Sequence, residues 1–262
     1  MKLGKRLSSL GLALWTAACA GTTSQGASPN NAASVSSEPA SEYTLVDPDK
    51  YPGAFPGMRP VAPPSGEPPL PMYGAMVLLP RVKDFAAWRT AFEQNRLARM
   101  DAGFVAQGIM RGVENDRMIA VWFAVTDVDL AKEYFARGDL RAGGVEGKAR
   151  VLLWSNVEAK MDPGRQGLSA ALVAIKVKDI AAFKLAFDAS ASARTNAGII
   201  GYGLSSDVDD PSVAYIYLQS ESPDTLKTYL AAKDTKQSWK EAGQTGTASI
   251  TIVREGELTT YQ

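Results

Sequence analysis

The chain has 262 residues, with 28 lysines and arginines balanced by 28 aspartates and glutamates, no histidine and a single cysteine. The lack of histidine excludes Ser–His–Asp and Cys–His catalysis and histidine-ligated zinc or haem, and the single cysteine excludes an internal disulfide and CxxC redox chemistry. Because a balanced charge offers no basic excess for counterion release, nucleic acid is not an expected partner. With 45% apolar residues, the chain can bury a core in one or two domains.

Residues 1–18 have the layout of an export signal. Basic side chains come first and a short apolar stretch follows, and about a dozen such residues are too few to span a bilayer. The string Thr16-Ala17-Ala18-Cys19 resembles a bacterial lipobox, the recognition site of lipoprotein signal peptidase. The resemblance implies cleavage between Ala18 and Cys19 and attachment of lipid to the Cys19 thiol. The alternative is an ordinary signal-peptidase site, with Cys19 a neutral residue beside it.

A lipid on Cys19 would place the protein in the cell envelope, with the membrane as a partner through that lipid. Two or more acyl chains, at about 0.8 kcal/mol per buried methylene, make such attachment effectively permanent. Ala20, which follows the cysteine, is not the aspartate that resembles an inner-membrane retention signal. In a Gram-negative host, the expected location is therefore the periplasmic face of the outer membrane.

Residues 19–72 form a predicted disordered tether. Its first part is rich in Ser, Ala, Thr, Gly and Asn and its second part in proline, with 11 of the chain's 15 prolines between positions 29 and 71. Such a composition has little apolar surface to bury and favours extended polyproline conformations. We interpret the segment as a spacer between membrane and globular body. The alternative is a proline-rich docking site for a partner or for peptidoglycan.

The rest of the chain contains an internal repeat. A shift of 95 residues places the run that begins at Val82 over the run that begins at Val177, and 12 of the 27 positions between 82 and 108 are then identical. Two copies of this length are too few for a solenoid. We therefore predict two duplicated domains, residues 73–160 and residues 168–256.

Both copies have the same predicted order of elements. The first helix follows an aspartate N-cap, Asp84 or Asp179, and stops at Gly103 or Gly198, where a left-handed residue is wanted. Apolar strands precede and follow this helix, and a second helix and a last strand complete the copy. The other expected elements are strands at 75–82, 104–110, 118–125 and 150–154, strands at 171–177, 199–205, 213–219 and 249–253, and helices that begin near Asp127 and at Ser222.

The order βαββαβ is that of a ferredoxin-like fold. Strands that are apolar on both faces need cover on both sides, so helices would cover one face and the sheet of the other copy the second. We predict an α+β protein in which two tandem ferredoxin-like repeats form an intramolecular pseudo-dimeric α/β barrel, preceded by a disordered stalk. Such a chain can be a monomer.

One sequence pattern connects this fold to a known superfamily. The pattern is a strand, the run Val-Lys-Asp-Phe-Ala-Ala-Trp-Arg-Thr-Ala-Phe from Val82, a later Arg and Ala-Gly, a second strand and an Asp-Asp-Pro turn. It resembles the dimeric α/β-barrel superfamily, which includes antibiotic-biosynthesis-monooxygenase-like and cyclase-like proteins. The resemblance implies the fold, and it leaves the activity open because the chemistry of the superfamily is varied.

Aromatic and arginine side chains are the candidates for a ligand pocket. Three tyrosines cluster on the second and third strands of the second copy, and one tryptophan is the repeat mate of one of them; their polar groups could orient a ligand, or they could fill the core. One arginine recurs at the same place in both copies, either as a cation near a helix C-terminus or as an anion site. The candidate pocket residues are Tyr202, Tyr215, Tyr217, Trp122, Arg99 and Arg194.

No metal and no cofactor is expected. The resemblance implies that cofactor-free oxygenases of the superfamily have cavities lined by aromatic and amide groups, and that its haem members generally coordinate iron through histidine, which this chain lacks; tyrosine ligation stays open in principle. The carboxylates at Asp127, Asp129, Asp209 and Asp210 fall at a helix start and in a turn, where they are expected in any case. The sequence has no EF-hand spacing, P-loop or GxGxxG after a strand.

We predict a lipid-anchored extracytoplasmic protein that binds a small apolar or aromatic molecule, or a partner protein, without catalysing a reaction. The absence of histidine, the commonest general base, places binding ahead of catalysis. The alternative is a cofactor-independent monooxygenase or cyclase acting on a small aromatic compound, with the repeat-two tyrosines and Arg194 or Asn196 around the substrate. Converging polar groups in an enclosed pocket would favour the enzyme, and an apolar surface patch would favour binding alone.

Overall fold

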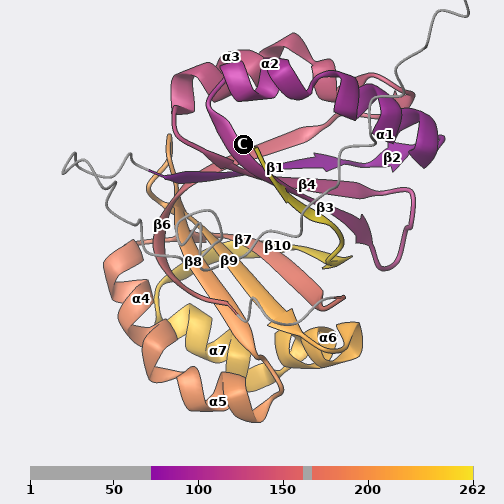
Figure 1. The fold of residues 1–262 in the computed structure, drawn as a ribbon. Coiled ribbons are helices and arrows are strands. Elements are labelled where there is room, and N and C mark those ends of the chain that lie inside the picture. Colours follow the sequence, from indigo (N-terminus) through magenta and orange to yellow (C-terminus); the bar gives the residue numbers. More distant parts are fainter. Residues whose placement is uncertain (1–71, 162–166, 262) are drawn as a thin grey trace, which may run out of the picture. The chain divides into compact units, whose positions relative to one another are not determined.

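The computed structural model describes residues 72–161 and 167–261. The predicted signal peptide, the predicted lipid site at Cys19 and all of the predicted tether except its last residue lie outside the described residues. Among the residues that are described, no helix is long and apolar enough to cross a membrane. The described part consists of two repeats that share the order βαββαβ in their main strands and helices and differ in short additional elements (Figure 1).

The first repeat runs from β1 to β6. Its strands are β1 (Tyr73–Leu79), β2 (Arg81–Val82), β3 (Phe104–Gly112), β4 (Ile119–Val125), β5 (Val145–Glu146) and β6 (Arg150–Lys160). Its helices are α1 (Phe85–Gln94), α2 (Arg96–Asp101), α3 (Val128–Arg137) and the short 3-10 helix η1 (Asp139–Arg141).

The second repeat runs from β7 to β11. Its strands are β7 (Ser169–Val177), β8 (Gly201–Asp207), β9 (Val213–Ser220), β10 (Gln244–Arg254) and β11 (Leu258–Thr260). Its helices are α4 (Ile180–Ala189), α5 (Ala191–Asn196), α6 (Pro223–Ala231) and α7 (Lys233–Glu241). Helix α7 and strand β11 have no counterpart among the expected elements.

Local sequence explains where the first helices start and stop. The Asp84 carboxylate accepts a hydrogen bond from Ala87 N at 3.0 Å, and Asp179 caps α4 in the same way. These bonds satisfy backbone donors that have no partner inside the helix. Gly103 and Gly198, with φ of 77° and 82°, adopt the left-handed conformation that the sequence predicts.

The first helix of each repeat is interrupted, where the sequence predicts a continuous one. At the interruption between α1 and α2, the Phe92 carbonyl accepts hydrogen bonds from Asn95 N at 3.2 Å and from the Arg99 guanidinium at 2.5 Å. The Arg194 guanidinium bonds the Phe187 carbonyl at the equivalent break between α4 and α5. An arginine side chain thus caps the end of the first helical segment in both repeats.

The strands form one closed antiparallel ring. The order is β6-β1-β4-β3 in the first repeat and β10-β7-β9-β8 in the second, which is the ferredoxin-like order. The last strand of each repeat pairs with the second strand of the other: β6 pairs with β8, and β10 pairs with β3 where Val253 lies opposite Gly112. Strand β11 continues along β3, with Leu258 opposite Gly108. The prediction of an intramolecular pseudo-dimeric barrel is therefore confirmed.

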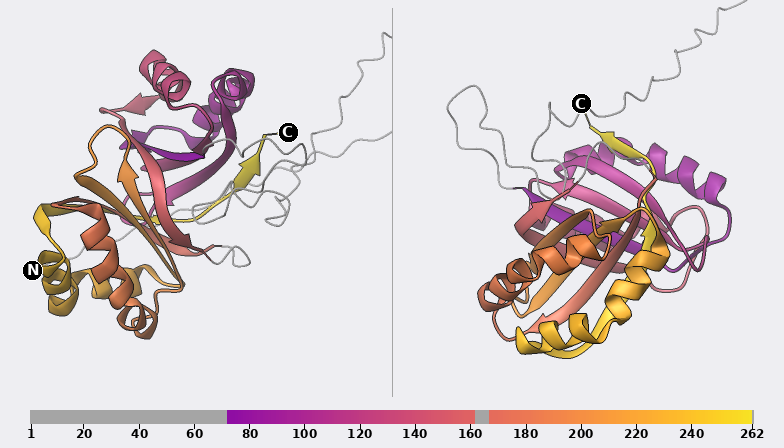
Figure 2. Two further views of the ribbon diagram at one scale, coloured as in Figure 1. Left: turned by 90° about the vertical axis from the view of Figure 1, so that its left-hand side faces the viewer. Right: turned by 90° about the horizontal axis from the view of Figure 1, so that it is seen from below.

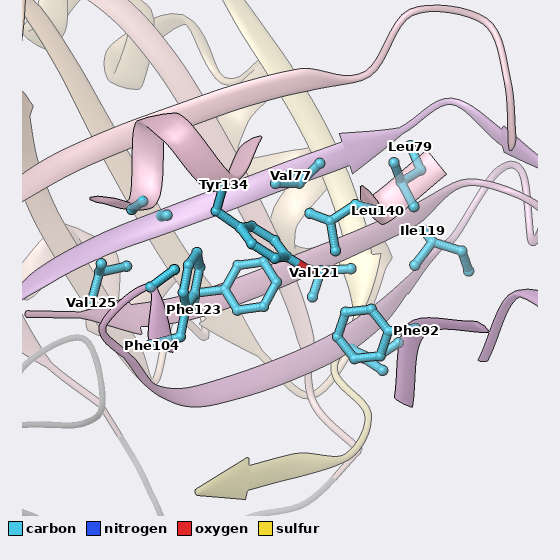
Figure 3. Packing of buried hydrophobic residues seen from close by; sticks show 14 of the residues in the cluster. Val77, Leu79, Phe92, Phe104, Ile119, Val121, Phe123, Val125, Tyr134 and Leu140 are labelled. Atoms are coloured by element: carbon cyan, nitrogen blue, oxygen red, sulfur yellow. The ribbon is translucent and has the colours of Figure 1, made fainter. Parts of the chain in front are cut away.

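Three hydrophobic clusters stabilise this arrangement. Helices α1 to α3 cover the outer side of the first repeat's strands and helices α4 to α7 that of the second (Figures 1 and 2). One cluster fills the space under each set of helices; in the first repeat it includes Phe92, Phe104, Phe123 and Tyr134 (Figure 3). The third cluster combines apolar side chains of both repeats on the opposite faces of the strands, inside the barrel. The strands therefore have apolar cover on both faces, as their sequences require.

Matching ion pairs also join the repeats. Glu257, just before β11, binds Arg89 Nη2 of α1 at 3.0 Å, and Glu158 of β6 binds Lys184 Nζ of α4. Glu158 and Glu257 occupy equivalent places, and so do Arg89 and Lys184, which are 95 residues apart. Each pair connects the last strand of one repeat to the first helix of the other.

Candidate functional site

The six candidate pocket residues lie on both sides of the strands and do not form one pocket. Trp122, Tyr215 and Tyr217 belong to the cluster inside the barrel. The other three lie on the helix side, with Arg99 in the first repeat and Arg194 and Tyr202 in the second. The structure therefore offers two kinds of site, one inside the barrel and one under the helices of each repeat.

Inside the barrel, a carboxyl group is held by a phenol and an amide. Glu255 Oε1 accepts hydrogen bonds from the Tyr217 hydroxyl at 2.6 Å and from Gln219 Nε2 at 2.7 Å. Burial raises the pKa of Glu255, against the effect of these two donors, and burial also raises the pKa of Tyr217 well above its ordinary value. This contact fixes the segment after β10 to β9 of the same repeat.

The aromatic side chains inside the barrel are closely packed. Trp154 Nε1 donates to Asn156 Oδ1 at 3.1 Å, and the indole ring lies 5.8 Å from the Tyr215 ring. A Cβ atom on Gly74 would lie 2.2 Å from Trp154 Nε1, so the indole rests directly on this glycine. The Tyr215 hydroxyl donates to Asp207 Oδ2 at 2.6 Å, and burial is the main cause of its raised pKa. These groups satisfy one another and fill the interior around them.

Under the helices of the first repeat, Arg99 is completely buried. Its Cζ atom lies 3.8 Å from the centroid of the Phe92 ring. Arg99 Nε donates to the Tyr261 hydroxyl at 2.6 Å, and this hydroxyl donates to Gln107 Oε1. Burial raises the pKa of Tyr261 to about 12, although the nearby Arg99 acts in the opposite direction. The phenol of Tyr261 is therefore neutral and bridges a cation and an amide.

Arg194 has the same position in the second repeat but fewer partners. It is 2% exposed, with its Cζ 3.7 Å from the Phe187 ring centroid and 4.6 Å from the Tyr202 ring centroid. Arg194 Nη1 donates to the Phe187 carbonyl and to Ser190 Oγ. Its Nε and Nη2 have no hydrogen-bond partner among residues 72–161 and 167–261.

This arrangement is costly unless something else binds Arg194. A buried polar donor without a partner costs about 1–3 kcal/mol, and more when it is charged. Arg99 Nη2 is also without a partner among the described residues, but Arg99 Nε is satisfied by Tyr261. The two repeats therefore differ at the Nε atom, which in Arg194 has no hydrogen-bond acceptor among the described residues.

The side chains around Arg194 combine aromatic surface with a carboxylate. The partly exposed Tyr202 donates its hydroxyl to Glu158 Oε1 at 2.7 Å. Hydrogen bonds from Lys184 and from Tyr202 lower the pKa of Glu158, and Arg194 contributes to this effect through its charge. Glu158 is thus ionised at neutral pH, with Lys184 as its direct ion-pair partner and Arg194 acting on it through its charge. Burial also raises the pKa of Tyr229, and the charge of Arg194 opposes that shift.

The predicted carboxylates have structural roles. Asp127 caps α3, Asp209 pairs with Lys132 at 2.5 Å, and Asp210 accepts hydrogen bonds from Ser212. In the described part of the chain, no three His, Cys, Asp or Glu side chains come together in a way that could hold a metal ion. Asn196 is exposed at the end of α5.

Sequence reasoning missed four polar residues of these sites. Gln107 and Tyr229 could have been found, because each is the repeat mate of a tyrosine, Tyr202 and Tyr134 respectively. Tyr261 and Glu255 carry no such signal, because their hydrogen-bond partners lie 36 to 162 residues away along the chain and become neighbours only in the folded protein.

Comparison with known proteins supports the fold. No protein-family model matches the chain, and no curated protein matches it. Among solved structures, a "putative monooxygenase" from Lactobacillus acidophilus NCFM aligns over 72% of this chain and 96% of its own, with 13% identity and a TM-score of 0.50. A second protein of that description, from Fusobacterium nucleatum, covers 72% of this chain and 94% of its own, at 14% identity and a TM-score of 0.50.

A third similar structure is that of an anthrone oxidase-like protein. It covers 72% of this chain and 93% of its own, with 11% identity and a TM-score of 0.51. A coverage of 72% exceeds the length of either repeat, so in all three cases the likeness extends over both. The described part of the chain therefore has the α+β ferredoxin-like fold of these proteins, with two repeats joined in one large antiparallel sheet.

Proposed function

We propose that the second repeat binds a small aromatic compound at Arg194 and oxidises it with dioxygen. The observation that carries this proposal is the buried Arg194 guanidinium, whose Nε and Nη2 have no partner among the described residues. It lies against the rings of Phe187 and Tyr202, which contact each other edge to face, so the surroundings of the guanidinium are aromatic. We therefore favour the monooxygenase alternative over binding alone.

The chemistry follows from the charge of Arg194. A guanidinium in a water-poor site stabilises an oxygen anion, so it would lower the pKa of a substrate hydroxyl or enol. Loss of that proton makes the aromatic ring electron-rich and reactive toward oxygen. In the net reaction, one oxygen atom of dioxygen becomes a carbonyl oxygen on the substrate, and the other leaves as water with the two hydrogens of the oxidised carbon.

The fold supports this proposal in a limited way. Two similar structures carry the name monooxygenase and one is called anthrone oxidase-like. At 11–14% identity these likenesses concern the fold, so the activity has to be argued from the Arg194 site itself. The ionised Glu158 matters here as well, because its negative charge acts on Arg194 as well as on its ion-pair partner Lys184.

Anthrone is the substrate with which to test the activity. The full chain should accelerate oxygen uptake and anthraquinone formation over the uncatalysed reaction. Arg194→Met should reduce this acceleration about 10- to 150-fold, because a hydrogen bond to a charged group is worth about 1.5–3 kcal/mol. Arg141→Met, which changes an exposed arginine, is the control and should keep the activity. Anthrone binding without oxygen uptake would indicate a binding protein that does not oxidise anthrone. The absence of both binding and oxygen uptake would refute the proposal.

We also propose that the protein is a lipoprotein of the cell envelope, held by acyl chains on Cys19. The lipobox-like string at 16–19 and the proline-rich segment after it support this location. Cells fed a radioactive fatty acid should label the wild-type protein and not Cys19→Ser, and the wild type should fractionate with membranes. Equal labelling of both proteins would end this proposal.

A further inference from the structure

The first repeat contains an aromatic hydroxyl that accepts from Arg99 Nε, whereas Arg194 Nε of the second repeat has no acceptor among residues 72–161 and 167–261. Tyr261 follows β11, its backbone N bonds Val105 O at 2.9 Å, and its side chain is 9% exposed within the helix-side cluster. Its hydroxyl accepts from Arg99 Nε at 2.6 Å and donates to Gln107 Oε1. A phenol in this position therefore has both its acceptor and its donor function satisfied.

The two arginines are oriented alike, which makes the comparison meaningful. In each repeat, the guanidinium lies over a phenylalanine ring, with Cζ to centroid distances of 3.8 Å for Arg99 and 3.7 Å for Arg194. In each, Nη1 donates to the backbone carbonyl of that phenylalanine. A planar group fixed by its ring face and by Nη1 has its Nε–H fixed too. Arg194 Nε is thus directed as Arg99 Nε is, toward the place that a phenol oxygen occupies in the first repeat.

We propose that the helix-side space of each repeat is a phenol-binding site, with the first copy occupied by the chain's own Tyr261 and the second open to a free phenol. For the second copy this inference rests on the proposed function, and it names the class of ligand. A phenol supplies the acceptor for Arg194 Nε and a ring for the aromatic walls. Anthrone belongs to the same class through its enol tautomer.

Charge favours a phenol over an aromatic carboxylate. Glu158 lies close enough to Arg194 for the guanidinium to stabilise its ionised form. A carboxylate ligand would add a second negative charge beside Glu158 in a buried place, whereas a phenol arrives neutral. The ring of Tyr202 already covers part of the Arg194 guanidinium, so Tyr202 could itself be the phenol that occupies the second copy. If Tyr202 were the resident phenol of the second copy, only its removal would open the site.

The experiment measures the number of p-cresol molecules bound by the folded full chain, by titration calorimetry. The wild type should bind one p-cresol, with toluene and 4-methylbenzoate at least tenfold weaker. Tyr261→Ala should bind two, because the vacated Arg99 site takes a second molecule. Tyr261→Ala with Arg99→Met should return to one, and so should Tyr261→Ala with Arg194→Met. Tyr261→Phe, which keeps the ring, should stay at one, and thermal unfolding checks that each variant is folded.

Several outcomes would overturn the inference. The first is a folded Tyr261→Ala protein that binds no additional p-cresol. The second is a preference for 4-methylbenzoate over p-cresol. The third is p-cresol binding by the Tyr202→Ala variant but not by the wild type. The test is separate from that of the oxidation. Anthrone turnover without p-cresol binding would refute the phenol site alone, and p-cresol binding without turnover would refute the oxidation alone. The comparison of Tyr261→Ala with Tyr261→Ala, Arg99→Met tests p-cresol binding in the first repeat independently of the result at Arg194.

Discussion

Gly74→Ala is expected to destabilise the protein strongly, although it adds a single methyl group. A Cβ at Gly74 would lie 2.2 Å from Nε1, 2.3 Å from Cε2 and 2.7 Å from Cζ2 of Trp154. To restore ordinary contact the indole must move by about 1 Å or more. Such a shift breaks the Trp154 to Asn156 hydrogen bond and disturbs the packing on Tyr215.

The magnitude follows from these two losses. Overpacking a close-packed core costs about 1–3 kcal/mol, and the buried hydrogen bond contributes about 0.5–1.5 kcal/mol. We expect the free energy of unfolding to fall by about 2–4 kcal/mol, or the melting temperature by about 4–16 °C for a protein of this size. Urea unfolding followed by tryptophan fluorescence would measure the change.

Gly108→Ala is the matched control inside the same barrel. There the nearest atom to a Cβ is the flexible end of Leu258 at 3.3 Å, and the next contacts are at 3.8 Å, so we expect a change within about 1 kcal/mol. Combining Gly74→Ala with Trp154→Leu should show strong coupling, because the smaller side chain removes the clash. If Gly74→Ala were as harmless as Gly108→Ala, the barrel interior would have room. The close packing of Trp154 on Gly74, from which the loss of stability is reasoned, would then be refuted.

Three further predictions concern buried and capping groups. Burial raises the pKa of Glu255, so the stabilising contribution of this carboxyl group is complete below its unfolded pKa and is lost as pH rises through its folded pKa. In urea unfolding, Glu255→Gln should therefore gain stability relative to the wild type as pH rises from 4 to 8. A difference in stability that stays constant over this range would contradict the prediction. Tyr261→Phe leaves Arg99 Nε and Gln107 Oε1 without partners and should cost about 1–3 kcal/mol of unfolding free energy by calorimetry, whereas no loss would mean that the hydroxyl bridge is unimportant. Asp179→Ala removes the N-cap of α4 and should cost about 0.5–2 kcal/mol in the same assay, with Asp179→Asn close to wild type.

Much of the fold could be predicted because the same pattern of sequence features occurs twice in the chain. The N-caps at Asp84 and Asp179 and the left-handed glycines at Gly103 and Gly198 mark equivalent helices 95 residues apart, and strands apolar on both faces require a second sheet. The interruption at Asn95 could not be predicted from local preference. It depends on a buried guanidinium, and its carbonyl partner is known only once the helix is packed.

The candidate site was predicted in part. The recurrence of Arg99 and Arg194 marks them as equivalent residues in the sequence, but their burial on Phe92 and Phe187 is a tertiary property. Tyr202, Tyr215 and Tyr217 look like one cluster along the sequence. In the sheet, Tyr202 lies opposite Leu218, which follows Tyr217 directly, whereas Tyr217 and Tyr215 are two residues apart and share a face. Tyr202 therefore points to the opposite face. The strand register, rather than the choice of residues, separates the candidates into two sites.

The exchange of last strands between the repeats has a consequence for how the molecule could diversify. In an assembly of two separate identical subunits, every substitution would appear in both halves, and the pairing would weaken on dilution. With both halves on one chain, the partner is always present at a high effective concentration. Each half is then free to change by itself, which is how Asn156 in one and Glu255 in the other can occupy equivalent places. Two repeats with the same fold can thereby carry different side chains at equivalent positions.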